Sequence, residues 1–314
     1  MNDSNNSVAF LFPGQGSQSV GMGKDLYEKY PLARQTFEEA DDALGYKLSQ
    51  VCFEGPEDQL RLTEITQPAI LTVSIAALRV LEMRMPKPSY VAGHSLGEYS
   101  AHVASGTISF ADAVRTVRNR GKYMQEAVPV GVGAMAAILG MDPEKVTACC
   151  HDAAQGEVCQ PANINSPEQI VISGNTAAVE RAAKLADERG AKKAKLLPVS
   201  APFHCSLMKP AQDRLESDLN QLKMQSPSYP VACNVDAALI TDDLRARDTL
   251  VRQVTGSVQW DQCIRLLVTQ GVQMFIEVGP GKVLWGLMRQ IDRSKTSLNV
   301  SDDATLQKTL DSLR

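Results

Sequence analysis

The sequence predicts a layered α/β protein with a mostly parallel sheet, and three observations lead to that prediction. Short apolar runs alternate with longer helical segments, a pattern typical of α/β folds. One apolar run leads into a Gly-x-Ser-x-Gly stretch at residues 93–97, where a strand must turn sharply into a helix. With 314 residues and 44% hydrophobic content, the chain is long enough to bury a large core in one or two compact units.

Outside the middle of the chain, the periodicity predicts the elements of one large sheet. Short apolar runs predict strands at residues 8–12, 90–92, near 231 and 274–278. Helical segments are predicted up to about residue 45, at 96–104, 110–127, 204–222, 243–255 and 261–270, and after the glycine-rich turn that follows residue 278. Pro68 suits the first turn of a helix, so we expect a long helix from there to about residue 83. The residues after Ser294 are polar, which predicts a loosely docked tail.

Residues 129–198 have a different rhythm. Strands are predicted at 134–139, 158–163, 169–173 and 194–199, and helices at 143–154 and 177–188. The resulting order, β-α-β-β-α-β, is typical of a ferredoxin-like unit. We therefore expect a small ferredoxin-like subdomain at 129–198, inserted into a large α/β domain made of residues 1–128 and 199–314.

Composition and charge narrow the classes of function. The N-terminus has no cationic start, and no later stretch approaches the roughly 20 apolar residues of a membrane span, so we expect a cytoplasmic protein without a membrane partner. The seven cysteines show no metal-ligand spacing, so we expect reduced, structural thiols and no metal site. A net charge of −4 gives no general attraction to nucleic acid. No segment demands a partner subunit, which leaves a monomer compatible with the sequence.

Ser95 lies in the most informative motif. The stretch GHSLG at residues 93–97 matches the nucleophile elbow of hydrolase-like α/β cores, in which two glycines permit a tight, strained turn that lifts the serine hydroxyl clear of the sheet. Backbone N–H groups at the start of the following helix can stabilise the negative oxygen of a tetrahedral intermediate. We therefore predict a hydrolase-like core with Ser95 as nucleophile. The alternative is an ordinary strand-to-helix turn.

A nucleophilic serine needs a base, and the sequence offers four histidines. His94 is adjacent to the serine and is expected to point elsewhere. His102 lies four residues after Glu98 and is most simply half of a surface pair, while His151 ends a polar helix and is expected to be solvated. His204 lies between a predicted strand and a predicted helix, where an open α/β sheet presents catalytic groups, and is the best candidate base. The alternative for His204 is a packed histidine that caps a helix.

The sequence nominates no acidic partner for this histidine. Four downstream aspartates are available, but none has a recognisable position at a strand end: Asp213, Asp236, Asp242 and Asp243. A Ser-His dyad whose histidine is oriented by a neutral group is therefore the more economical interpretation.

Two glycine-rich turns raise the alternative of a nucleotide site. In PGQGSQSVG, Ser19 stands where a dinucleotide fingerprint would need its third glycine. In VGPGKVL, Lys282 could reach a phosphate, but the spacing matches neither the dinucleotide fingerprint nor the P-loop. Structural turns are the simpler interpretation.

Seven blocks, taken together, resemble a known family. They are FPGQGSQ, GHSLGEYSA, RGKYMQEAVP, NINSPEQIVISG, APFHCSLM, VRQVTGSVQW and EVGPGKVL. In this order and at these distances they resemble the malonyl-CoA:acyl carrier protein transacylase family, from about residue 8 to residue 292. Seven blocks in sequence are far more specific than any one of them.

The resemblance implies catalytic roles for particular residues. Ser95 matches the family nucleophile, which takes the malonyl group from coenzyme A, and His204 matches the base that activates it. Gln253 matches the residue whose backbone carbonyl steadies the histidine. The backbone N–H groups of Gln15 and Leu96 match the family's oxyanion hole.

Further matches concern the substrate. Arg120 matches the arginine that pairs with the free malonyl carboxylate, which a guanidinium can hold with two charge-assisted bonds. Acetyl and longer fatty acyl groups would leave that arginine unpaired. From the residues alone, a solvated helix arginine is the alternative. Leu96 and Phe203 resemble the malonyl rather than the methylmalonyl pattern of related acyltransferases, and Asn163 matches an asparagine near the family's active site.

The implied reaction is a ping-pong transfer without a cofactor. Malonyl-CoA acylates the serine, and the phosphopantetheine thiol of an acyl carrier protein then takes the malonyl group. The pathway supplied is expected to be fatty acid synthesis, with a polyketide synthase as the alternative. Because carrier proteins are usually acidic, a basic landing site is expected. There are two candidate patches. The first contains Arg189, Lys192, Lys193 and Lys195, and the second contains Arg115, Arg118 and Lys122.

Two other functions stay open on the residues alone. A serine esterase or thioesterase could use the same elbow, but it would want an acidic triad member and a route for water, and the sequence offers neither clearly. A non-enzymatic acyl- or CoA-binding subunit is the other, and the presence of Ser95, His204 and Arg120 argues against it.

Overall fold

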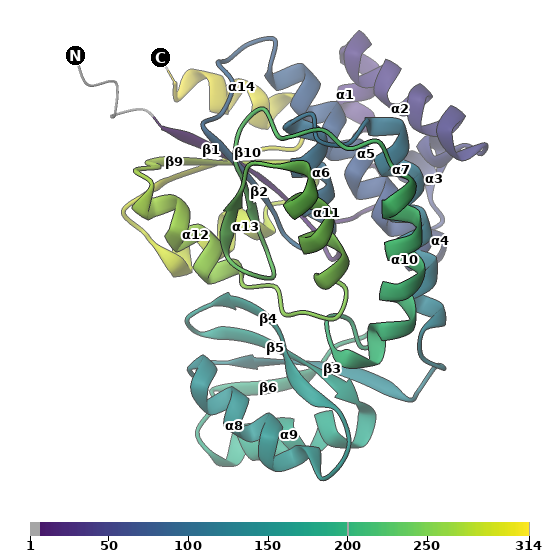
Figure 1. Ribbon diagram of the computed structural model, residues 1–314. Coiled ribbons are helices and arrows are strands. Elements are labelled where there is room, and N and C mark those ends of the chain that lie inside the picture. The colour runs from purple at the N-terminus through teal and green to yellow at the C-terminus, as the bar shows by residue number, and fades with distance from the viewer. Residues whose placement is uncertain (1–6, 200, 314) are drawn as a thin grey trace.

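The computed structural model describes residues 7–199 and 201–313, and within them the strands form two sheets (Figure 1). The larger sheet has the order β10-β9-β1-β2-β7-β8, and every neighbouring pair in it is parallel except β7 with β8. Its strands are β1 (Val8–Phe12), β2 (Tyr90–Gly93), β7 (Val231–Cys233), β8 (Ala238–Ile240), β9 (Met274–Val278) and β10 (Thr296–Val300). The predicted α/β class with a mostly parallel sheet is confirmed, whereas β8 and β10 were not predicted.

Helices cover both faces of the larger sheet because its central strand is apolar on both sides. Phe10 and Phe12 of β1 point into one buried cluster, while Ala9 and Leu11 point into a second cluster on the opposite face. The second cluster contains side chains of α12 (Trp260–Thr269) and α13 (Val283–Ile291). The first contains side chains of α1 (Lys24–Lys29), α2 (Pro31–Leu44), α3 (Leu48–Glu54), α4 (Glu57–Leu60), α5 (Thr63–Leu81), α6 (Leu96–Ala104), α7 (Phe110–Glu126), α10 (Lys209–Gln221) and α11 (Asp243–Arg252).

Helix α5 corrects two expectations. It begins at Thr63 and contains Pro68, so the expected start at the proline is wrong. The earlier turn is held by tertiary packing, since a Cβ at Gly121 of α7 would come within 2.5 Å of the Thr63 carbonyl oxygen. By length and composition alone α5 could cross a membrane, so the expectation that no stretch approaches this length is wrong. However, 83% of its apolar 18-residue window is buried inside the fold. It is therefore placed as a core helix.

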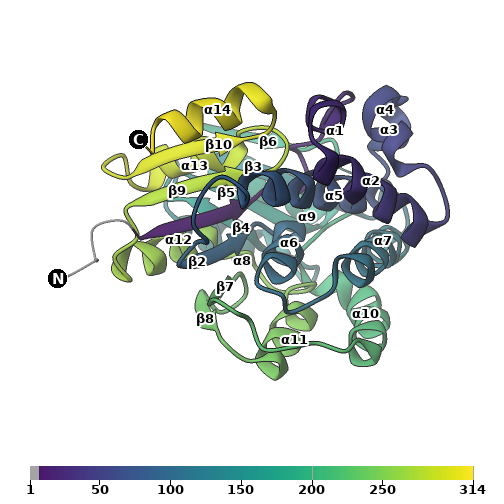
Figure 2. The ribbon, with the colours of Figure 1, turned by 90° about the horizontal axis from the view of Figure 1, so that it is seen from above.

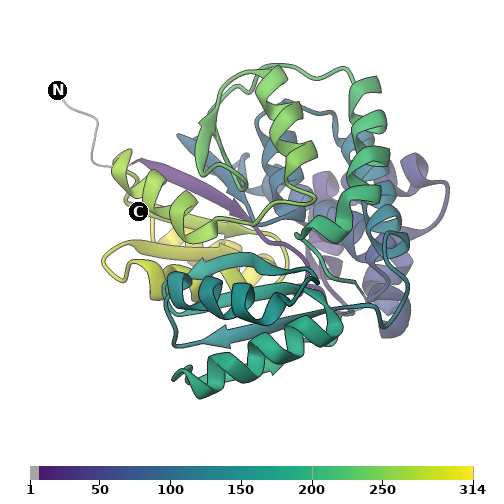
Figure 3. The same ribbon diagram turned by 60° about the horizontal axis from the view of Figure 1, so that its bottom comes forward.

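The smaller sheet is antiparallel, with the order β4-β5-β3-β6. Its elements follow the predicted β-α-β-β-α-β order: β3 (Gly133–Leu139), α8 (Pro143–Ala154), β4 (Cys159–Ser166), β5 (Gln169–Asn175), α9 (Thr176–Glu188) and β6 (Lys193–Leu196). Figure 3 shows α8 and α9 covering its outer face, where Ala136 and Ile138 meet them. Met135 and Ala137 point the other way and pack into the large cluster that also contains α5 and α7. The two sheets thus share a core.

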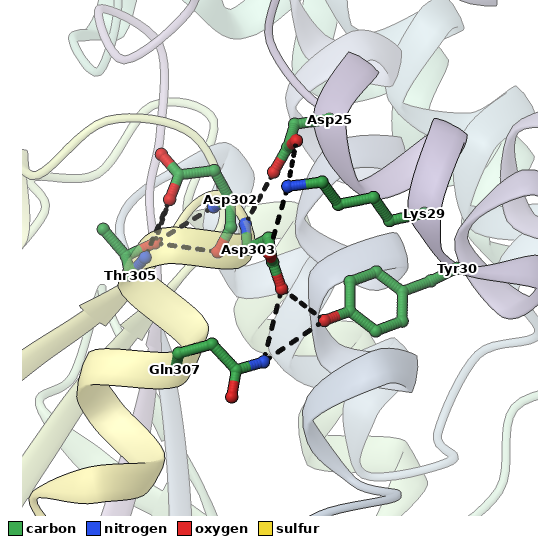
Figure 4. A network of polar contacts seen from close by, with 7 residues as sticks. All are labelled: Asp25, Lys29, Tyr30, Asp302, Asp303, Thr305 and Gln307. Carbon is green, nitrogen blue, oxygen red and sulfur yellow. Dashed lines mark hydrogen bonds and ion pairs between the residues drawn. The ribbon is translucent and has the colours of Figure 1, made fainter.

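The segment after Ser294 is docked, so the expected loose tail is wrong. β10 pairs along β9, and α14 (Asp303–Asp311) lies beside it (Figure 2). The first turn of α14 is tied to α1, because Asp303 accepts hydrogen bonds from Lys29 and Tyr30 and its N–H donates to Asp25 (Figure 4). The polar side chains that suggested a free tail are the ones that make these contacts. Arg314 lies outside the described residues, as do residues 1–6 of the N-terminal segment and Ser200, the last residue before the His204 block.

Candidate active site

A cavity of about 370 Å³ lies between the carboxyl ends of β1 and β2 and the inner face of the smaller sheet. Ligands of open α/β sheets bind at this end of the strands. Much of the wall is apolar, with Met124, Met135, Val171, Leu197, Val199 and Phe203 among the lining side chains. Its polar floor contains Ser95, Arg120 and His204. The cavity therefore combines a water-excluding wall with groups that can carry out polar chemistry.

Ser95 occupies a strained turn between β2 and α6. Its φ and ψ are 51° and −107°, which a residue with a side chain rarely adopts. The flanking glycines are required by contact, since a Cβ at Gly93 would collide with the backbone of Gly97, and a Cβ at Gly97 would collide with the Phe12 carbonyl. The close approach of these backbones forces the turn and directs the Ser95 hydroxyl into the cavity.

His204 meets Ser95 from a segment more than a hundred residues later. Its Nε2 lies 2.7 Å from Ser95 Oγ, and its Nδ1 lies 2.9 Å from the backbone carbonyl oxygen of Gln253. A carbonyl can only accept, so Nδ1 carries the proton and Nε2 is free to accept the serine proton. Burial, assisted by the positive charge of Arg120, lowers the pKa of His204 to about 3. The histidine is therefore a neutral base at physiological pH.

Arg120 is buried beside the nucleophile, with 1% of its surface exposed. Its Nη1 donates to Gln67 Oε1 at 2.8 Å, and its Nη2 donates to Gln253 Oε1 at 2.9 Å and to Ser95 Oγ at 3.1 Å. Its Nε has no hydrogen-bond partner in the described part of the chain, and no carboxylate there forms an ion pair with it. A buried cation held only by neutral acceptors can bind an anionic group that enters the cavity.

Two backbone N–H groups at the cavity are available to an incoming oxygen. Leu96 is the first residue of α6, so its N–H has no acceptor within the helix, and the N–H of Gln15 follows the end of β1. Within residues 7–199 and 201–313, neither group donates to a protein acceptor. The N–H of Ser95 itself is already used, because it donates to Asn234 Oδ1 at 2.7 Å.

The remaining candidates from the sequence also lie at the cavity. Asn163 on β4 and Phe203 beside the histidine both line it and are largely buried. His94, which was expected to point elsewhere, lines it too, but its Nε2 bonds Asn165 Oδ1 at 2.8 Å and its ring contacts Trp260. It does not contact Ser95 Oγ.

The candidate acids and Lys282 have other roles. Asp213 forms an ion pair with Lys209, and Asp236 forms one with Arg252. Asp242 caps α11, and Asp243 accepts a hydrogen bond from Ser226. Lys282 precedes the first turn of α13. Among the described residues, the group that meets His204 Nδ1 is the neutral carbonyl of Gln253.

Sequence reasoning missed three buried polar residues around the site. Gln67 lies inside α5 and Asn234 follows the end of β7, a strand-end position that could have drawn attention to it. Glu98 was expected to form a surface pair with His102, but both side chains are fully buried on α6 and do not bond each other. The Glu98 carboxyl instead accepts from Gln253 and Asn234. Periodicity cannot separate a surface pair from a helix that is covered on all sides.

Comparisons with known proteins place this arrangement in a family. The family model named acyl transferase domain matches residues 9–308 of this sequence. A malonyl CoA-acyl carrier protein transacylase from Salmonella typhimurium is 49% identical over 303 residues, covering 96% of this chain and 98% of the relative. One from Bacillus subtilis is 48% identical over 308 residues, covering 98% of this chain and 97% of the relative.

Solved structures agree with the sequence relatives. The malonyl CoA-acyl carrier protein transacylase of Coxiella burnetii superposes with a TM-score of 0.96 at 44% identity, over 98% of both chains. A malonyl-transacylase solved in complex with a type II PKS acyl-carrier protein superposes with a TM-score of 0.95 at 45% identity, over 98% of this chain and 100% of that chain. The chain therefore belongs to the acyl transferase family and, within it, to the malonyl CoA-acyl carrier protein transacylases.

Proposed function

We propose that this protein transfers the malonyl group of malonyl-CoA to the phosphopantetheine thiol of an acyl carrier protein, through a malonyl ester on Ser95. One observation carries the proposal: Ser95 Oγ lies 2.7 Å from the neutral Nε2 of His204 and 3.1 Å from the buried guanidinium of Arg120. Nucleophile, base and anion-binding group thus surround a single point of the cavity.

In the first half of the reaction, Ser95 Oγ attacks the thioester carbonyl while His204 Nε2 takes its proton. The N–H groups of Gln15 and Leu96 bind the oxyanion of the tetrahedral intermediate. When the intermediate collapses, the carbon–sulfur bond breaks and the coenzyme A sulfur takes the proton from His204. The Gln253 carbonyl keeps the imidazole in the required tautomer, which is the task that an aspartate performs in a triad.

The second half repeats these steps with a different nucleophile. His204 takes the proton of the phosphopantetheine thiol as its sulfur attacks the malonyl ester, and the proton returns to Ser95 Oγ when the ester bond breaks. Both halves use the same oxyanion hole. Coenzyme A enters as part of the substrate and leaves as a free thiol, so the cycle requires no resident cofactor.

Arg120 selects the acyl group. Its Nε has no partner in the described part of the chain, and its Nη groups bond only neutral amides and the serine. These groups can therefore donate to the malonyl carboxylate. An acetyl group would leave the guanidinium without that partner. Phe203 and Leu96 shape the cavity for malonyl rather than methylmalonyl, and Asn163 supports the bound acyl group from the smaller sheet.

The carrier protein docks along β6. Of the first basic candidate, Arg189 pairs with Asp152 and Lys192 pairs with Glu168, whereas Lys193 and Lys195 have no carboxylate partner in the described part of the chain. Strand alternation puts both lysines on the same face of β6 as Ala137 of the neighbouring strand, and the chain continues from them to Leu197 at the cavity. Acidic helices of a carrier could rest there while its arm reaches Ser95.

The second candidate is less available. Arg115 pairs with Asp112, Lys122 approaches Glu126, and Arg118 stacks over the Tyr46 ring. These three cationic side chains therefore already have partners on this protein.

The proposal includes a compartment, an organisation and a pathway. We place the enzyme in the cytoplasm as a monomer, with residues 129–198 as a small subdomain that closes the cavity over the large domain formed by 1–128 and 199–314. It supplies fatty acid synthesis. Supply of a polyketide synthase is the alternative, which the likeness to a malonyl-transacylase bound to a type II PKS acyl-carrier protein favours.

The test is mass spectrometry of the intact protein after addition of malonyl-CoA, with and without holo acyl carrier protein. A malonyl adduct that disappears as malonyl-carrier appears supports the transfer. Release of free malonate at the rate of adduct loss would identify a thioesterase, and unmodified protein with bound malonyl-CoA would identify a binding subunit; either result would refute the proposal.

A further inference from the structure

Glu98 is a fully buried carboxyl on α6, next to the elbow but outside the cavity. Its Oε2 accepts two hydrogen bonds, from the side-chain Nε2 of Gln253 at 2.7 Å and from the backbone N–H of Asn234 at 3.0 Å. Its Oε1 has no partner in the described part of the chain. One oxygen of this carboxyl therefore joins two residues that follow different elements, Asn234 after β7 and Gln253 after α11.

The first of these residues, Asn234, holds the elbow. Its Oδ1 accepts from the N–H of Ser95 at 2.7 Å, and its Nδ2 donates to the carbonyl of Gly93 at 2.8 Å. These two backbone groups lie on either side of His94, where the chain enters its strained conformation. Asn234 is therefore placed to hold the turn that presents the nucleophile.

The second residue, Gln253, holds the two other functional groups. Its backbone carbonyl binds His204 Nδ1 at 2.9 Å, and its Oε1 accepts from Arg120 Nη2 at 2.9 Å. Its Nε2 donates to Glu98 and also to the Ser95 carbonyl. The guanidinium can only donate, and the carboxyl oxygen accepts, so together Arg120 and Glu98 fix which way this amide points.

We propose that Glu98 is a positioning residue that fixes Asn234 and Gln253 together, and through them the mutual geometry of Ser95, His204 and Arg120. The proposal rests on the proposed function, since it concerns the acylation of Ser95. Glu98 touches neither substrate nor reacting atoms. Its contribution is one shared acceptor. Without it, the Gln253 amide keeps only its 3.0 Å bond to the Ser95 carbonyl and a 3.5 Å bond to Asn234 Oδ1, and the backbone N–H of Asn234 loses its acceptor.

The chemistry of the carboxyl suggests how to separate its acceptor role from its charge. Burial raises the pKa of Glu98 to about 7. Because Oε1 has no partner, a proton can reside there while Oε2 keeps both bonds. Glu98→Gln can likewise keep an acceptor at the Oε2 position, whereas Glu98→Ala removes the acceptor and Glu98→Asp withdraws it by one methylene group.

The experiment measures the rate of Ser95 acylation from malonyl-CoA and from acetyl-CoA for wild type and four variants. Glu98→Ala and Glu98→Asp should acylate at least about tenfold more slowly with both donors, the scale of a misplaced reacting group, and should also lose preference for malonyl. Asn234→Ala removes the two short bonds to the elbow and, of the contacts to Gln253, only the 3.5 Å bond to its Nε2. It should therefore slow acylation from both donors and keep the preference for malonyl. Glu98→Gln should recover most of the wild-type rate and preference.

Folding is checked separately by circular dichroism and thermal melting, and Glu98→Asp replaces Glu98→Ala if the latter does not fold. Wild-type acylation rates in either folded variant would overturn the proposal, as would a Glu98→Gln enzyme as slow as Glu98→Ala. These results are distinct from failure of the proposed function, which would appear as absence of the malonyl adduct on wild-type Ser95.

Discussion

Arg120 Nη2 lies 3.1 Å from Ser95 Oγ, so the buried guanidinium and the candidate nucleophile are in direct contact. The same hydroxyl lies 2.7 Å from His204 Nε2, which is its proton acceptor. The positive charge beside the serine favours an anionic acyl donor, and beside the histidine it disfavours an imidazolium ion. We therefore propose that this one residue affects both substrate choice and the protonation state of the base.

Ser95→Ala should abolish the malonyl adduct, because among the described residues that line the cavity no other group is both nucleophilic and in contact with the base. The measurement is the intact mass after mixing with malonyl-CoA. Ser19→Ala, an exposed serine in the loop after β1, is the control and should be labelled like wild type. A labelled Ser95→Ala protein would remove the central assignment.

Arg120→Ala should lower kcat/KM for malonyl-CoA by about a hundredfold or more, since loss of a desolvated charge partner typically costs 2–5 kcal/mol. Acetyl-CoA, which has no carboxylate, should be accepted in part. Steady-state rates with the two donors measure the preference, and Arg115→Ala on the exposed face of α7 is the matched control. Unchanged malonyl kinetics in Arg120→Ala would count against the carboxylate role.

The activity should persist at low pH. A solvated imidazole protonates as the pH falls through about 6.5, but burial and Arg120 lower the pKa of His204 to about 3, so its basic form survives well below that range. The pH profile of kcat/KM should therefore show no loss around pH 6.5. In Arg120→Gln, assayed with acetyl-CoA, the acid limb should move to higher pH because the repulsion is gone. A wild-type acid limb near 6.5 would contradict this assignment.

Lys193→Glu combined with Lys195→Glu should raise the KM for the acyl carrier protein severalfold, because the acidic partner meets the reversed charges only while docking. Acylation by malonyl-CoA alone should be unchanged. The matched control reverses Lys145 and Lys184, which lie on α8 and α9 at the outer face of the smaller sheet. Equal effects on both half-reactions would discard this surface.

Asp303→Asn should lower the melting temperature by roughly 2 °C, since it weakens the contacts that dock α14 on α1. Hydrogen bonds from Tyr30 and Lys29 lower the pKa of Asp303 from 3.8 to about 2. Its stabilisation is thus present above the ordinary carboxyl pKa and is lost as the pH falls through about 2. The difference in melting temperature between wild type and Asp303→Asn should narrow in that acid range. The control Asp58→Asn, at an exposed position, should have the wild-type melting temperature at every pH. A difference that does not change with pH would show that the Asp303 charge is not involved.

The sequence by itself determined the fold class and supplied the candidate catalytic residues. Strand runs such as residues 8–12 and the two glycines around Ser95 are local signals, because apolar periodicity and tight backbone turns depend on neighbours in the chain. The resemblance then singled out His204, Arg120 and Gln253 before any distance was known. In the structure His204 and Arg120 line one cavity with Ser95, and Gln253 contacts both of them.

Only the tertiary structure decided what lies around those residues. Glu98 and His102 have the spacing of a surface pair, yet both are buried because α6 is covered on all sides. Asn234 and Gln67 belong to no motif, and the polar side chains near Asp303 suggested a free tail. In each case the partner lies far away in the sequence, and burial or pairing across that separation is fixed by how the elements pack, which a local pattern does not encode.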